Sequence, residues 1–85
     1  MPEICRFRGI VIFMYFGDHE PPHFHVRYQG FNSSISINQL VIESGELPPK
    51  ILRLVQEWAK YHQDELKENW ELCKNDQLPK SIKPL

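Results

Sequence analysis

The chain has 85 residues, of which 41% are hydrophobic and 25% are charged. These fractions are typical of an ordinary globular domain and exclude the low-hydrophobicity, high-charge profile of a disordered segment. Ten Lys and Arg residues against eleven Asp and Glu residues give a formal net charge of -1, so the net charge gives no support to nucleic-acid binding, which would need a local basic patch.

The first predicted element is an almost wholly apolar run from Phe7 to Phe16. A run rich in β-branched and aromatic residues, without polar alternation, predicts a central strand covered on both faces. Although Arg6 and Arg8 precede it, as basic residues precede the core of a signal peptide, the run is too short to span a bilayer and no small-residue cleavage site follows. We therefore expect a cytoplasmic protein without membrane association, in which Cys5 and Cys73 stay reduced.

A stiff turn with two prolines leads into a segment from His23 to Tyr28 that alternates between polar and apolar side chains. Because successive side chains on a strand point to opposite faces, this period predicts a half-buried strand. The apolar side chains expected in the core are Phe24, Val26 and Tyr28. The polar side chains expected on the opposite, solvated face are His23, His25 and Arg27. The same logic predicts a third strand over residues 32–38 and a short fourth strand over residues 40–42.

From Pro48 onward the apolar period changes to steps of three and four, which predicts a helix ending near Lys74. A continuous helix of that length would extend about 39 Å, whereas a seven-residue strand extends only about 23 Å. Either the helix bends or divides near residues 61–64, or its second half projects past the sheet and needs a partner. The apolar side chains available to such a partner, or to a second copy of the chain, would be Trp58, Leu66 and Trp70.

These elements predict a single α+β domain over residues 1–85. We expect an antiparallel sheet of three or four strands within residues 1–45, in the order β-β-β-(β)-α. A long or kinked C-terminal helical segment over residues 48–75 would pack on one face of the sheet, and residues 76–85 would form an extended tail.

Three histidines gather in a His-x3-His-x-His pattern formed by His19, His23 and His25. Two strand residues that are two apart lie about 6–7 Å from each other on one face, close enough to chelate one ion. His19 can join them if the diproline loop turns tightly, and either Asp18 or Glu20 can supply an oxygen ligand. Three donors with an open position resemble a catalytic zinc site or another divalent transition-metal site.

Two other interpretations of the same face stay open. In a metal-free ribonuclease, His23 and His25 would act as general base and acid while Arg27 held the phosphate. In the simplest interpretation, these side chains form the polar, solvated face of a half-buried sheet, which can still bind another protein. The sequence alone does not decide whether the protein is an enzyme.

Several segments together resemble a known family. They read Pro-Glu-Ile-x-Arg-Phe-x-Gly-Ile, Asp-His-x-Pro-Pro-His-Phe-His-Val, Leu-Val-x-Glu-Trp, Glu-Leu-x-x-Asn-Trp and Ile-x-Pro-Leu, and they extend from Pro2 to Leu85. This set is similar to domain of unknown function 4160 (DUF4160). The resemblance implies a short bacterial or archaeal protein, often encoded beside another small domain in an arrangement like that of toxin–antitoxin pairs. Some members are labelled transcriptional regulators. The resemblance implies no catalytic residues.

Residues and resemblance together favour an interaction or regulatory protein in a toxin–antitoxin-like pair. Its functional surface would be the face with His23, His25 and Arg27, and its contacts to a protein partner or a second copy would lie on the helical segment or the sheet. The alternative is an enzyme built on the three clustered histidines, either a metal-dependent hydrolase or a metal-free ribonuclease.

Overall fold

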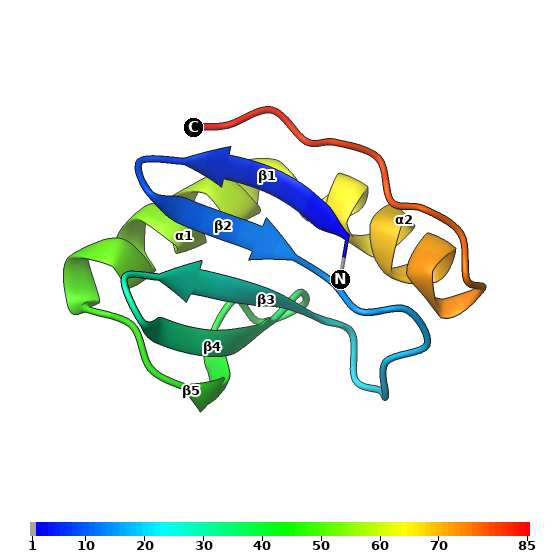
Figure 1. Cartoon of the computed structure of the whole chain (residues 1–85), viewed down its shortest axis with the longest axis horizontal. Helices are drawn as coiled ribbons and strands as arrows, with labels where there is room; N and C mark the ends of the chain where they lie inside the picture. The colour runs from blue at the N-terminus through cyan, green and yellow to red at the C-terminus, as the bar shows by residue number, and fades with distance from the viewer. Residues whose placement is uncertain (1) are drawn as a thin grey trace.

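The computed structural model describes residues 2–85, in which five strands precede two helices. The strands are β1 (Glu3–Phe7), β2 (Ile10–Phe13), β3 (His23–Tyr28), β4 (Phe31–Ser36) and β5 (Ile42–Gly45), and the helices are α1 (Pro49–Tyr61) and α2 (Gln63–Lys74). The strands form one antiparallel sheet in sequence order, and the helices lie behind one of its faces (Figure 1). The predicted α+β class is confirmed, with five strands in place of three or four.

The extra strand comes from a hairpin inside the apolar N-terminal run. Phe7 pairs with Ile10, and the two residues between them, Arg8 and Gly9, have φ values of 50° and 77°. Positive φ at both central residues is what a tight two-residue hairpin of type I′ needs, and glycine suits its second position. The prediction of one strand over residues 7–16 was therefore wrong, because apolar residues on both sides of Arg8 and Gly9 masked the turn.

Strand β5 lies later in the chain than predicted. Residues 40–42 were expected to form the fourth strand, but the strand is Ile42–Gly45, and Gly45 pairs with Ser33 of β4. Gly45 has a φ of 77°, and a Cβ atom there would lie 2.8 Å from the Cα of Ser33. Glycine therefore permits a close approach of two strands at this position.

The core lies between the sheet and the helices, as the alternation in β3 predicts. Phe24 and Val26 have no exposed surface, and Tyr28 packs at the edge of the same cluster. Trp58 of α1 is also fully buried, and its ring centroid lies 6.1 Å from that of Phe24 and 5.9 Å from that of Phe7. These three aromatic side chains connect α1 to β3 at the centre of the sheet and to the edge strand β1.

The helical segment divides where the length argument places a break. Helix α1 ends at Tyr61 and α2 begins at Gln63, so the predicted division near residues 61–64 is confirmed. Within residues 2–85, no helix has both the length and the apolar content required to cross a bilayer. The break lets α2 fold back on the chain, so Leu66 and Trp70 are buried there with 0% and 3% exposure. Trp58, Leu66 and Trp70 are therefore core residues of the folded chain, and binding of a partner at the helical segment stays a prediction.

The C-terminal residues run along β1 at the edge of the sheet (Figure 1). The backbone N–H of Ile82 donates to the carbonyl of Ile4, and the Ile82 side chain is only 3% exposed. Two residues earlier in the tail, Lys80 is held by the buried side chain of Asn69 on α2. The Asn69 side chain donates to the carbonyl of Lys80 at 2.9 Å and accepts from its N–H at 2.8 Å. The tail thereby covers an edge strand whose backbone groups would otherwise face solvent.

Candidate metal centre

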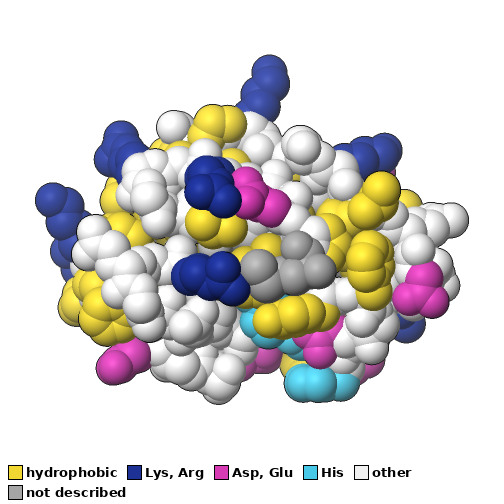
Figure 2. Space-filling view, viewed as in Figure 1, with side chains coloured by type: hydrophobic (Ala, Val, Ile, Leu, Met, Phe, Trp, Pro, Cys, Tyr) yellow, Lys and Arg dark blue, Asp and Glu magenta, His cyan; other side chains and the backbone are white. Residues whose placement is uncertain are grey.

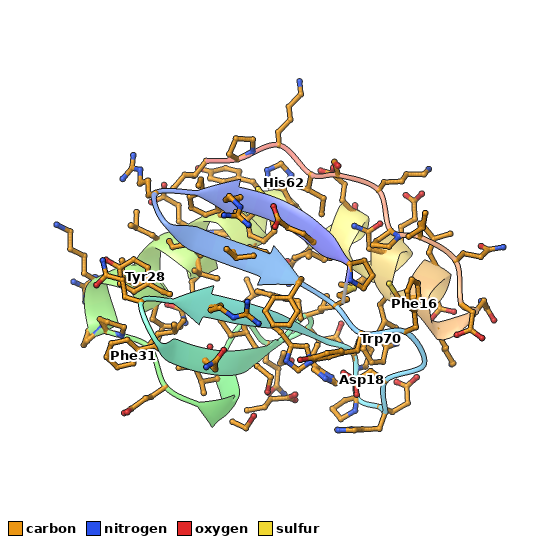
Figure 3. All side chains as sticks on the ribbon, viewed as in Figure 1. Phe16, Asp18, Tyr28, Phe31, His62 and Trp70 are labelled. Atoms are coloured by element: carbon orange, nitrogen blue, oxygen red, sulfur yellow. The ribbon has the colours of Figure 1, made fainter. Side chains whose placement is uncertain are left out.

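The loop between β2 and β3 carries Asp18 back over the start of β3. The N–H of Gly17 donates to the carbonyl of Cys73 near the end of α2, at 3.0 Å. At the other end of the loop, the carbonyl of Pro22 accepts from the N–H of Ile37. Figure 3 labels Asp18 at the same end of the sheet as Trp70 of α2. Contacts with α2 and with the residue after β4 therefore fix the loop that was predicted to be stiff.

Asp18, His23 and His25 converge on one point. Oδ2 of Asp18 lies 2.9 Å from Nε2 of His23 and 3.0 Å from Nε2 of His25. One donor atom from each of the three residues lies within 4.8 Å of the other two. The histidines share a face because they are two residues apart on β3, and the loop supplies the carboxylate opposite them.

His19 does not belong to this group, although it was a predicted ligand. Its side chain is 84% exposed, and its Nε2 lies 3.8 Å from Oδ1 of Asp18. The same Oδ1 accepts a hydrogen bond from the backbone N–H of His19 at 2.8 Å. The loop therefore turns the Asp18 carboxylate toward the strand and the His19 ring toward solvent. Among residues 2–85, the group contains Asp18 in place of His19.

The environment of His23 also differs from the prediction. We expected both strand histidines to lie on a solvated face away from the helices, but the His23 side chain is only 4% exposed. Its ring centroid lies 5.1 Å from that of Trp70, because α2 folds back over this end of the sheet. His25, whose side chain is 22% exposed, keeps an opening to solvent.

The hydrogen bonds of His23 require a proton or a cation next to its second ring nitrogen. Its Nδ1 lies 2.7 Å from the carbonyl oxygen of Pro21, and since a carbonyl only accepts, Nδ1 carries a hydrogen. In a neutral ring, Nε2 would then present a lone pair to the Asp18 carboxylate at 2.9 Å, which is repulsive. Either a second proton or a cation must lie between the two atoms. Metal-binding histidines commonly donate their other ring N–H to a backbone carbonyl, as His23 does.

Asp18 supplies a negative charge to this point. Burial raises the pKa of its carboxyl group, but the hydrogen bonds from His25 and from the backbone N–H of His19, together with the charge of His23, outweigh burial and lower the pKa below its usual value. Asp18 is therefore ionised at neutral pH and can act as a ligand without first losing a proton.

The donor set fits a transition-metal ion. Donors at about 2.1 Å from an ion, on adjacent octahedral positions, lie about 3.0 Å apart, and the two distances from Asp18 Oδ2 are 2.9 and 3.0 Å. Two imidazole nitrogens and one carboxylate oxygen suit zinc, iron or another first-row divalent ion and leave coordination positions open. Two of the three donor pairs therefore lie at the separation expected for ligands of one ion.

A hollow of about 370 Å³ adjoins the site on the sheet face that the helices leave open. The aromatic and polar side chains that line it include Phe13, Tyr15, His25, Asn32, Ser34 and Ser44. His25 links the hollow to the metal ligands, because its ring stacks on Phe13 with centroids 5.3 Å apart while its Nε2 faces Asp18. Figure 2, which views this face, shows histidine side chains beside acidic and apolar ones.

Arg27 lies on the expected face but outside the group of three ligands. Its guanidinium carbon lies 5.2 Å from the centroid of the Phe13 ring, and its cross-strand neighbour Asn32 lines the hollow. The sequence prediction did not include the hollow. Phe13 and Tyr15 are two residues apart, so the sequence could have placed both aromatic side chains on one face of a strand. This pattern was not recognised, because the run that contains them was interpreted as a strand covered on both faces.

Comparison with known proteins identifies the family. The family model described as a domain of unknown function, DUF4160, matches residues 9–71, a stretch that includes all three candidate ligands. No curated protein matches the chain, and no solved structure does. Since the match covers well over half of the 85 residues, the resemblance noted in the sequence is confirmed, and the chain belongs to the DUF4160 family.

Proposed function

We propose that this protein is a metal-dependent hydrolase in which Asp18, His23 and His25 hold one divalent transition-metal ion. The observation that carries the proposal is the pair of contacts made by His23, which leave its Nε2 lone pair facing a carboxylate in a side chain that is 4% exposed. An ion bound between the two atoms gives both lone pairs a partner.

Three protein donors leave room for a water molecule and a substrate on the same ion. A bound ion of this kind would lower the pKa of a water ligand to about 7. In hydrolysis the water oxygen forms a bond to the electrophilic centre, the bond to the leaving group breaks, and the leaving group takes up the proton. A substrate would approach from the side of His25, which is the more exposed histidine and lines the hollow.

A second buried donor favours a polar occupant near the site. Nε1 of Trp70 is buried and has no hydrogen-bond partner among the described residues, and its ring packs on His23. Buried N–H groups normally find an acceptor, often an ordered water molecule. A hydrated ion beside His23 would bring such water into this part of the structure.

The metal-free ribonuclease has less support. A general acid or base must reach the proton that it transfers, directly or through one water molecule. Both ring nitrogens of His23 already face protein oxygens, and the side chain is almost completely buried. His25 alone is accessible, so the pair of histidines does not provide an accessible acid and an accessible base.

Metal analysis of the native protein, purified without an affinity tag, tests the proposal. We expect one ion per chain, and a rise in melting temperature when zinc, manganese, nickel or iron(II) is added to chelator-treated protein. At a free-ion concentration of 100 times Kd, the added stability would be about 2.7 kcal/mol. Asp18→Asn and His25→Gln should remove the response, whereas His19→Gln should keep it. Absence of a bound ion together with no thermal response to any of the four, or an undiminished response in Asp18→Asn, would rule out the site.

As a second candidate, we propose that the protein also pairs with another protein, as in toxin–antitoxin systems. Tyr15 and Phe16 support this role, because two consecutive aromatic side chains are each 43% exposed in the loop beside the metal site. Native mass spectrometry of the protein mixed with the product of the adjacent gene tests the pairing. A complex weakened by Phe16→Ser is expected, and a persistent monomer would contradict this role.

A further inference from the structure

We propose that two copies of this chain pair through the outer surface of α1, with the two helices antiparallel around a two-fold axis. Three adjoining hollows follow this surface and share lining residues with one another. Together they form the α1 surface, which runs from Lys50 in the first turn of α1 to Glu65 in the first turn of α2, with residues 39–41 along its side. It contains none of the three candidate metal ligands, so this inference does not rest on the proposed metal site.

The central part of the α1 surface exposes large apolar side chains. Tyr61 is 74% exposed and Val41 is 47% exposed, and both line a hollow of about 520 Å³. The side of this hollow is fixed, because Nε2 of Gln56 donates to the carbonyl of Leu40 at 2.8 Å. Exposed apolar patches mark interaction sites, and tyrosine is enriched in protein–protein interfaces. This part of the surface therefore indicates a binding site for a protein.

The charges of the α1 surface change sign along its length. Lys50 and Arg53 lie at its beginning, Asp64 lies at its end, and Glu57 and Lys60 lie between them. Within residues 2–85, none of these five side chains forms an ion pair. A two-fold axis brings the beginning of one helix against the end of the other, so basic residues meet acidic ones. The surface is therefore complementary in charge to a second copy of itself.

One alignment of the two helices pairs these charges twice. An axis level with the space between positions 58 and 59 places each residue of α1 opposite the residue equally far on the other side of that point. Glu57 then lies opposite Lys60 of the second copy, and Arg53 lies opposite Asp64 of the second copy. Because the axis is two-fold, each pair occurs twice. Exposed ion pairs add little affinity individually, so these charges mainly set the orientation.

The same alignment accounts for the exposed tyrosine. Tyr61 lies opposite Gln56 of the second copy, and Gln56 lines the central hollow. The ring of each copy would therefore enter the central hollow of the other, beside Val41. Large aromatic side chains that fill a pocket at the centre of an interface supply much of its binding energy. We therefore assign most of the affinity to Tyr61.

Analytical ultracentrifugation of the whole chain over a range of concentrations tests the pairing. We expect a reversible dimer, and Tyr61→Ser should raise its dissociation constant by at least about tenfold. A chain that stays monomeric up to about 1 mM, or a dimer that Tyr61→Ser leaves unchanged, would overturn the proposal. If Tyr61→Ser instead abolished binding of the adjacent gene product to a monomeric chain, the α1 surface would bind that protein and not a second copy.

Charge exchange tests the alignment itself. Glu57→Lys and Lys60→Glu should each weaken the dimer, because each places like charges opposite one another. An equal mixture of the two variants should recover it, since one chain then presents two lysines and the other two glutamates. Glu71→Lys, on the exposed face of α2, changes the charge as much as Glu57→Lys and should leave the dimer unchanged. A mixture that stays as weakly paired as its components would overturn the antiparallel arrangement.

Discussion

Oδ2 of Asp18 and Nε2 of His23 lie 2.9 Å apart, although one residue comes from a loop and the other from the buried start of a strand. The contact is compatible with a carboxylate only if a proton or a cation lies between the two atoms, since the other ring nitrogen of His23 already donates to Pro21. The stability of this end of the protein should therefore depend on the ionisation of Asp18.

In metal-free protein, Asp18→Asn should lower the free energy of unfolding by about 2 kcal/mol at pH 7, because hydrogen bonds to a charged acceptor are lost. The pKa of Asp18 is lowered in the folded chain, so its carboxylate stabilises the fold above the ordinary aspartate pKa of about 3.9. That contribution disappears as the pH falls through the lower, folded pKa. Urea unfolding with a chelator at several pH values should show the two proteins converging in acid.

The control for Asp18→Asn is Glu20→Gln in the same loop. Glu20 pairs with Lys74 at 3.2 Å, but both side chains are about half exposed, so the substitution should change the free energy of unfolding by less than about 0.5 kcal/mol. A difference between Asp18→Asn and wild type that stays constant down to acid pH would show that ionisation of Asp18 does not stabilise the fold.

The two tryptophans differ in whether the indole N–H has a hydrogen-bond acceptor, so they can be compared directly. Trp58 donates from Nε1 to the carbonyl of Lys83 at 2.8 Å, whereas Nε1 of Trp70 has no protein partner among residues 2–85. In metal-free protein, Trp58→Phe should therefore cost about 1 kcal/mol more than Trp70→Phe in chemical unfolding, because only the former breaks a hydrogen bond. An equal or larger loss in Trp70→Phe would mean that its N–H has an acceptor in the metal-free state.

Two glycines with positive φ should tolerate alanine to different degrees. Gly17 and Gly45 have φ values of 61° and 77°, but a Cβ on Gly17 meets nothing within 4 Å, while one on Gly45 approaches the backbone of Asn32 and Ser33. Gly17→Ala should cost about 1 kcal/mol from backbone strain alone, and Gly45→Ala about 3 kcal/mol or more. Equal losses in urea unfolding would contradict the close approach of β4 and β5.

The tail should contribute to stability through one buried side chain. Ile82 is 3% exposed and Leu85 is 41% exposed, so Ile82→Ala should lower the free energy of unfolding by about 2–3 kcal/mol and Leu85→Ala by less than about 1 kcal/mol. Thermal and urea unfolding of the two variants measure this difference. If both changes were small, the tail would not be packed on the body in solution.

The sequence contained a good part of the fold because the relevant signals are local. Period-two alternation placed Phe24 and Val26 in the core and His25 on the opposite face, and all three lie as predicted. The mismatch in length between helix and sheet predicted either a break near residues 61–64 or a projecting helix, and the structure has the break, with α1 ending at Tyr61. The turn at Arg8 and Gly9 was missed, since its flanking residues are apolar on both sides and the alternation gives no sign of a reversal.

The residues of the site followed from the sequence only in part. The strand period by itself determined that His23 and His25 share a face, because side-chain direction on a strand depends on parity alone. Only the tertiary structure decided that Asp18, not His19, completes the group, and that His23 is buried under Trp70. Both outcomes depend on where α2 returns to the sheet and on the bond from Gly17 to Cys73, residues that lie 56 positions apart in the 85-residue sequence. A contact over such a distance leaves no periodic signal in the chain, since it is set by the packing of complete elements.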